Sequence, residues 1–117
     1  MRLLCIAARD PYQDDRAQEL VDALLVAAAF GTKVSVLFQG DGLWQLLPGQ
    51  QGSLAGRKTL GAQLEALPLY DVDRVYVDAA DLARTGLCSD QLLLPVTVLD
   101  DHGLQALLRD HDQVMRP

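Results

Sequence analysis

The chain has few cysteines, few aromatic residues and few basic residues. Its 117 residues include two cysteines, 5% aromatic residues, and ten Lys and Arg against 16 Asp and Glu. Two cysteines are too few for a disulfide framework. A formal net charge of −6, without any basic cluster, argues against a surface that binds nucleic acid. No apolar run approaches the roughly 20 residues of a membrane-spanning helix. This composition predicts a cytoplasmic protein with reduced thiols that contacts neither nucleic acid nor membrane.

Apolar residues, in contrast, are abundant. Half of the chain is hydrophobic, and its length is that of one ordinary domain. The sequence contains no internal repeat, no low-complexity segment and no linker. We therefore expect residues 1–117 to form a single domain with a substantial core.

Short apolar segments alternate with amphipathic ones. Segments of the first kind predict strands at residues 3–8, 34–38, 72–77, 94–99 and 113–115. Segments of the second kind predict helices at about residues 15–30, 43–47, 54–67 and 79–85, and a last helix that carries Leu104, Leu107 and Leu108. Alternation of this kind is typical of parallel sheets covered on both faces. We therefore predict an α/β fold, a three-layer α/β/α sandwich with a five-stranded, mainly parallel sheet.

Residues with capping preferences mark the ends of these helices. Asp15 is expected to begin the first long helix, and Gly31 to end it. Pro68 is expected to stop the helix of residues 54–67. Gly86 should close the short helix before it, and Asp100 or its neighbour should cap the last one.

Acidic residues follow several predicted strands, which invites comparison with a phosphate-accepting receiver domain. Asp14, Asp15 and Asp78 have the required order, but such a domain also needs a lysine after its last strand. The two lysines, Lys33 and Lys58, lie elsewhere. Helix capping explains the acidic residues better.

No motif for a metal or a cofactor is present. His102 and His111 lack ligand spacing and are expected on the surface of the last helix. The segment Gly40-Asp41-Gly42 lacks the third glycine of a dinucleotide fingerprint and is expected to be a tight turn. A small-molecule binder remains an alternative, although no phosphate-cradling loop supports it.

Two helices carry more apolar surface than one sheet can bury. Residues 23–30 are apolar nearly all round, which predicts that Val26 and Phe30 face another subunit. The short helix after the second strand carries four large apolar residues that cannot all point one way. We predict that these also contribute to an interface: Leu43, Trp44, Leu46 and Leu47.

The two cysteines differ in their surroundings. Cys5 lies within an apolar strand and should be a buried core residue. Cys88 lies in a predicted loop, where a reactive thiol is an alternative interpretation. No basic residue adjoins it in sequence to favour the thiolate, and the acidic Asp90 is nearby.

The segment DGLWQLLPGQ, residues 41–50, resembles the D-G-V-x-Q-L-L-P-G-Q stretch of the TusC (DsrF-like) family in the DsrE/DsrF superfamily. Residues 22–25, 69–72, 80–87 and 112–115 also resemble segments of that family, so the resemblance covers nearly the whole chain. Thr85 stands where the family often has Arg.

The resemblance implies a partner complex. In this family a TusC-type subunit assembles with TusB-like and TusD-like subunits into a heterohexamer. That complex passes persulfide sulfur from a TusA-like carrier toward a TusE-like carrier, for 2-thiouridine synthesis in tRNA. In sulfur-oxidising bacteria, a similar DsrEFH complex handles sulfur instead, and this alternative stays open.

One departure from the wider superfamily bears on chemistry. In the superfamily, the TusD-like sister subunit carries its sulfur on a cysteine near the end of the third strand. The corresponding stretch here begins Val75-Tyr76-Val77-Asp78 and contains no thiol. A phenol cannot form a persulfide, so the resemblance implies a non-catalytic subunit, with a thiol carrier using Cys88 as the alternative.

Overall fold

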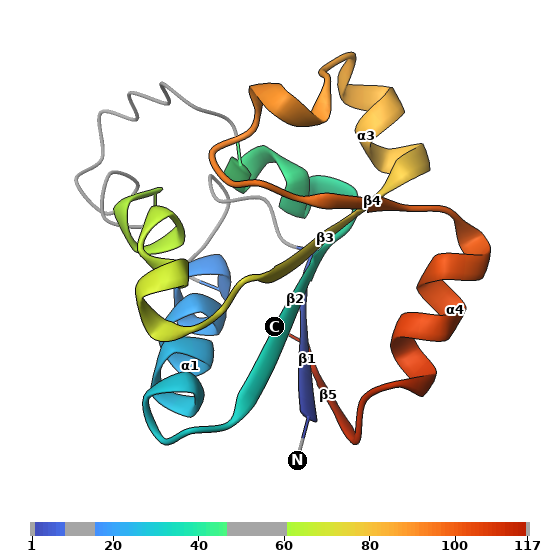
Figure 1. Ribbon diagram of the computed structural model, residues 1–117. Coiled ribbons are helices and arrows are strands. Elements are labelled where there is room, and N and C mark those ends of the chain that lie inside the picture. Colours follow the sequence, from blue (N-terminus) through green and yellow to red (C-terminus); the bar gives the residue numbers. More distant parts are fainter. Residues whose placement is uncertain (1, 9–15, 47–60, 117) are drawn as a thin grey trace.

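The structure, a computed structural model, describes residues 2–8, 16–46 and 61–116. Its centre is a parallel sheet with the strand order β4-β3-β2-β1-β5 (Figure 1). The strands are β1 (Arg2–Ala7), β2 (Lys33–Phe38), β3 (Arg74–Asp78), β4 (Thr97–Leu99) and β5 (Gln113–Met115). The inner strands are continuously apolar because both of their faces are covered.

Helices lie on both faces of this sheet, so the prediction of a three-layer α/β/α sandwich is confirmed. Helix α1 (Arg16–Ala29) and the helical residues 61–65 cover one face, and α4 (Asp101–Arg109) covers the other (Figure 1). The short helices η1 (Gly40–Leu46) and α3 (Ala79–Thr85) lie at the carboxyl edge of the sheet.

The two faces bury cores of different size. The α1 face holds the larger cluster, in which Leu24, Phe38 and Leu64 are almost completely buried. The α4 face holds a small cluster built on alternate residues of the same strands: Leu4, Ile6, Leu37 and Leu107. The strand period of two sends successive side chains of β1 to opposite faces.

Several boundaries differ from the sequence prediction. Residues 40–46 form a 3-10 helix, and β4 contains only three residues of the predicted 94–99. The segment before β4 does not pair as a strand; a backbone hydrogen bond of 2.8 Å from the Leu93 N–H to the Leu46 carbonyl holds it in place. The helical residues end at 65, before Pro68 as expected but two residues earlier than predicted. Pro68 itself occupies the first turn of η2 (Leu67–Tyr70), where its missing N–H costs nothing. Residues 54–60 lie outside the described part of the chain.

The capping predictions that fall on described residues are confirmed. Asp78 accepts hydrogen bonds from the backbone N–H groups of Ala80 and Asp81, and Asp100 accepts one from Gly103. Gly31 and Gly86 end their helices with positive φ angles of 87° and 74°. Asp15 lies outside the described residues.

His111 is not on the surface of the last helix, so that prediction is wrong. Its Nδ1 lies 2.7 Å from the Leu107 carbonyl, and its Nε2 lies 2.9 Å from the hydroxyl of Ser35 on β2. The residue follows α4 in the turn before β5, and it ties this turn to the buried side of the sheet. His102 is exposed on α4, as expected.

Candidate functional site at the carboxyl edge of the sheet

The carboxyl ends of β1, β2 and β3 surround a groove of about 530 Å³. We call it the carboxyl-edge groove, and the residues that line it are Ala8, Gly40, Asp41, Trp44, Asp81, Arg84 and Thr85. Parallel α/β sheets place ligand sites at this edge, because the loops that follow the strands meet there.

A buried carboxylate organises the floor of this groove. Asp81, on α3, accepts a hydrogen bond of 2.7 Å from the Gly40 backbone N–H and forms an ion pair with Arg84. The carboxylate thus joins α3 to η1, while the guanidinium remains mostly exposed at the groove. Nothing in the sequence analysis singled out these two residues, although a lone acid beside apolar neighbours, three residues before an arginine, is a usable signal.

Close packing fixes the position of η1 at this edge. A Cβ atom placed on Gly42 would lie 1.8 Å from the Ala7 carbonyl oxygen, so only glycine allows this approach to β1. The turn expected from Gly40-Asp41-Gly42 is therefore a contact between η1 and β1 as well as a change of direction.

The acidic residues expected near the strand ends do not converge on a metal site. Asp78 and Asp100 are helix caps, and Asp41 is exposed beside the groove. Asp10, Asp14 and Asp15 lie outside the described residues. Among residues 2–8, 16–46 and 61–116, no group of three His, Cys, Asp or Glu side chains is placed to hold a metal ion.

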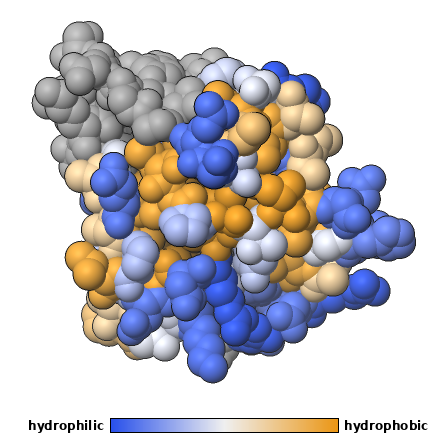
Figure 2. Space-filling view, turned by 45° about the horizontal axis from the view of Figure 1, so that its top comes forward, coloured by the Kyte–Doolittle hydropathy of each residue, from blue (hydrophilic) through white to orange (hydrophobic). Residues whose placement is uncertain are grey.

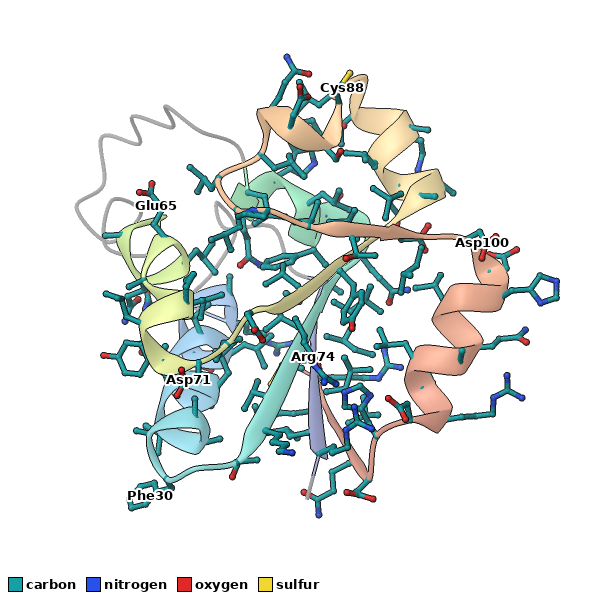
Figure 3. All side chains as sticks on the ribbon, in the orientation of Figure 1. Phe30, Glu65, Asp71, Arg74, Cys88 and Asp100 are labelled. Carbon is teal, nitrogen blue, oxygen red and sulfur yellow. The ribbon has the colours of Figure 1, made fainter. Side chains whose placement is uncertain are left out.

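The two thiols lie in opposite environments. Cys5 is completely buried, and this burial raises the pKa of its thiol to about 12. Cys88 is exposed on the connection after α3, where its backbone N–H donates to the Gln91 side chain over 2.7 Å (Figure 3). Cys88 is not among the residues lining the carboxyl-edge groove. The neighbouring groove is lined by Ser89, Asp90 and residues 92–96.

The end of β3 carries no sulfur. Tyr76 packs against the small core cluster on the α4 face, Val77 is buried on the other face, and Asp78 caps α3. The stretch identified from the sequence as the thiol-free counterpart of a carrier site is thus occupied by packing and capping residues.

The predicted interface residues divide into two groups. Leu43 and Leu46 are buried in the core of the chain itself, so the prediction that they face a partner is wrong. The 3-10 geometry of η1 turns both toward the α1-face core, while Trp44 remains 38% exposed. Leu47 lies outside the described residues.

The outer side of α1 is exposed and apolar. Val26 is 58% exposed, and Phe30, which Figure 3 places at the end of α1, is 86% exposed. The neighbouring η2, which contacts α1, adds the exposed apolar residues Leu69 and Tyr70. Neither residue is marked by a motif in the sequence, because the segment around Pro68 is expected only to end a helix. Figure 2 shows a further concentration of hydrophobic side chains near the carboxyl edge.

Comparison with known proteins identifies the family to which the chain belongs. The model of the DsrE/DsrF-like family matches residues 1–117. The chain belongs to the DsrE/DsrF-like family. It is 42% identical to a Pseudomonas aeruginosa protein named "Protein TusC homolog", with 97% of this chain and 95% of that protein covered. A protein of the same name from Vibrio vulnificus is 39% identical, with 90% and 89% covered. The resemblance to the TusC family read from residues 41–50 is therefore confirmed.

Solved structures agree on the fold. The YchN protein of E. coli superposes with a TM-score of 0.85 at 15% identity, covering 99% of this chain and 98% of that one. A protein of unknown function from Methanobacterium thermoautotrophicum superposes with a TM-score of 0.67 at 18% identity, covering 99% of this chain and 97% of that one. Within the described residues, no helix is long and apolar enough to cross a membrane.

Proposed function

We propose that this chain is a non-catalytic subunit of a TusBCD-type sulfurtransferase complex. In this proposal it assembles in the cytoplasm with TusB-like and TusD-like subunits into a heterohexamer. The complex passes persulfide sulfur between TusA-like and TusE-like carriers for 2-thiouridine synthesis in tRNA. The observation that carries the proposal is the 42% identity to a TusC homologue over 97% of the chain.

The distribution of thiols supports a role without covalent sulfur chemistry. A persulfide carrier needs an accessible thiolate as nucleophile. Cys5 is buried with its pKa raised to about 12, and the end of β3 presents Tyr76 and Asp78. A sulfur carrier in the complex would then belong to a sister subunit.

The exposed apolar side of α1 supports a role in assembly. Phe30 and Val26 are more exposed than large apolar residues usually are in a chain that works alone. We propose that these two residues and Trp44 contact the sister subunits, because aromatic side chains contribute strongly to protein interfaces.

Co-expression with the TusB-like and TusD-like proteins of the same organism tests this function. Native mass spectrometry should give a complex with two copies of each subunit. A chain that stays monomeric in the presence of both sister proteins would contradict the proposal.

Substitution on α1 tests the contact surface separately. Phe30→Glu should abolish or strongly weaken assembly while the isolated chain keeps its unfolding temperature, since the side chain is exposed. Leu108→Glu is the matched control, because Leu108 is an exposed apolar residue on α4. Equal loss of assembly in both variants would remove the assignment of the interface to α1.

A thiol carrier that uses Cys88 is the second candidate, favoured by the exposure of that residue. Incubation with a persulfide donor followed by peptide mapping separates the two functions. We expect no persulfide on Cys88 under conditions that load the TusD-like subunit, and full relay activity in Cys88→Ser. Loading of Cys88 together with loss of relay in Cys88→Ser would favour the carrier.

A further inference from the structure

Three cations lie together on one face of the sheet, at the amino ends of the central strands. Arg2 on β1 is the register partner of Lys33 on β2. Arg74 on β3 is the register partner of Ser35, two residues after Lys33. Register partners, and residues two apart on one strand, point to the same face of a sheet. The side chains of Arg2, Lys33, Ser35 and Arg74 therefore all lie on one face.

The contacts of this face identify it as the side that α4 covers. The Ser35 hydroxyl lies 2.9 Å from Nε2 of His111, in the turn after α4, and Arg2 forms an ion pair of 2.9 Å with Asp110 of the same turn. Figure 3 labels Arg74, which begins β3. Neighbouring strands are separated by about 4.8 Å, so the long side chains from β1, β2 and β3 can reach a common point.

A groove of about 360 Å³, which we call the amino-edge groove, opens at the amino ends of these strands and extends to Ala28 and Val34 on the α1 side. Arg2, Lys33, Ser35 and Arg74 line it, together with Thr32 and Tyr70. The wall formed by the connection from η2 to β3 carries two carboxylates, Asp71 and Asp73. The volume exceeds that of a single hydrated ion and suits a small polar ligand.

Two of the three cations of this groove have no carboxylate at ion-pair distance among the described residues. Arg2 is paired with Asp110, but within residues 2–8, 16–46 and 61–116 neither Lys33 nor Arg74 forms an ion pair. Both are exposed, in a chain whose formal net charge is −6. Like charges held side by side repel each other, and a bound anion removes this repulsion while it gains charge-assisted hydrogen bonds.

We propose that the amino-edge groove is a binding site for a tetrahedral oxyanion of the phosphate or sulfate type. Lys33 and Arg74 supply its direct contacts, and Arg2 adds positive charge from β1. Asp71 and Asp73 weaken binding by repulsion. The site is separate from the carboxyl-edge groove and does not depend on the function proposed above.

Titration of the full-length chain with inorganic phosphate locates the site. Heteronuclear NMR at constant ionic strength, with chloride as the balancing anion, should give shifts confined to the backbone of residues 31–35 and 73–74. Shifts spread over the whole chain, or the same shifts with chloride alone, would show that only general ion association takes place and would overturn the proposal.

Substitution tests which side chains hold the anion. Arg74→Gln and Lys33→Gln should each weaken phosphate binding about tenfold, the loss expected for a hydrogen bond to a charged group. Asp73→Asn should tighten binding, because it removes a repulsive charge. Arg109→Gln, which removes an exposed cation on α4 away from the groove, is the matched control. An unchanged dissociation constant in Arg74→Gln, or equal weakening in Arg109→Gln, would contradict the assignment.

The same titration distinguishes a free anion from the phosphate group of a larger molecule. Tighter binding of glycerol phosphate than of phosphate assigns the groove to organic phosphates, and equal affinity assigns it to the inorganic oxyanion. No measurable binding of either would overturn the proposal.

Discussion

The two faces of the sheet are held by different interactions. On the α1 face, apolar side chains of α1, β1, β2, β3 and residues 64–67 form one large core. On the α4 face, the apolar cluster is small, and polar contacts near the amino edge supplement it. The α1 face should therefore resist local opening more strongly, while the stability of the α4 face should depend more on salt.

The outer surfaces of the covering helices differ in the opposite sense. The exposed positions of α4 are mostly polar (Asp101, His102, Gln105 and Arg109), with Leu108 as its exposed large apolar residue. The exposed positions of α1 are polar in its first half (Arg16, Glu19 and Asp22) and apolar in its second half (Ala23, Val26 and Ala29), and the exposed Phe30 follows. A helical segment that is apolar on both sides, like the second half of α1, is typical of burial in a larger assembly. The helix that packs more extensively against the sheet thus also has the more fully exposed apolar side chains at its end, with Val26 58% and the adjoining Phe30 86% exposed, against 42% for Leu108 of α4.

The largest expected effect is the difference in reaction rate between the two thiols. Cys5 lies in the α1-face core, so its reactivity measures how often that core opens. Cys88 should react with a thiol reagent at once, whereas Cys5 should react at least roughly 1000-fold more slowly, because labelling needs unfolding. Time-resolved mass spectrometry measures both rates. Fast labelling of Cys5 in the native chain would show that this core opens locally.

The raised pKa of Cys5 predicts that the stability of the chain depends on pH. Burial raises the pKa of Cys5 to about 12, from an ordinary value of 9.0. Between these values the unfolded thiol ionises and the folded one does not, so Cys5 lowers the free energy of unfolding as the pH rises from 9 to 12. Cys5→Ala should lack this component when denaturant curves are compared across that range.

Truncation of core residues compares the two faces directly. Leu24→Ala should cost about 3 to 5 kcal/mol of unfolding free energy, because the side chain is surrounded by the large cluster. Leu107→Ala on the α4 face should cost about 2 kcal/mol, because its cluster is small and lies nearer to solvent. Chemical denaturation measures both. A larger loss for Leu107→Ala would reverse the ranking of the two faces.

Removal of the histidine contact should have an intermediate effect. His111→Ala leaves the buried Ser35 hydroxyl without its partner, at a cost of about 1 to 3 kcal/mol. Ser35→Ala in the same background should recover part of this loss, since no hydroxyl is then left unsatisfied. A double-mutant cycle gives the coupling energy, and additive effects would show that the two groups do not interact.

The smallest expected effect is that of the ion pair between Arg2 and Asp110. Arg2→Gln should cost less than about 1 kcal/mol, because the pair is partly exposed and screened by salt. The difference from wild type should shrink further at 1 M salt. A cost that persists at high salt would point to packing of the arginine stem instead.

Local patterns were enough to predict much of the architecture. The apolar segments around Cys5, Val36 and Val114 all form strands, and Asp78, Asp100, Gly31 and Gly86 cap helices as expected. These features depend on residues close in sequence, on the strand period of two, and on the preference of glycine for positive φ. The family resemblance was also readable from residues 41–50.

Other features depend on residues far apart in the chain, and the local sequence carried no sign of them. Leu43 and Leu46 are buried because η1 packs against the end of β1, a contact that the local sequence does not indicate. His111 is drawn inward because the turn after α4 lies beside Ser35 of β2. The contact of Asp81 with Gly40 joins residues 41 positions apart.

The order of strands and helices along the chain, several of their ends and the absence of a thiol from the third strand all follow from neighbouring residues, so the amino-acid sequence alone was enough to predict them. Tertiary structure alone decided which apolar side chains are core and which remain exposed on α1. It also decided that Arg2, Lys33 and Arg74 share one groove. The physical reason is that burial and charge proximity are set by the pairing register of strands distant in sequence.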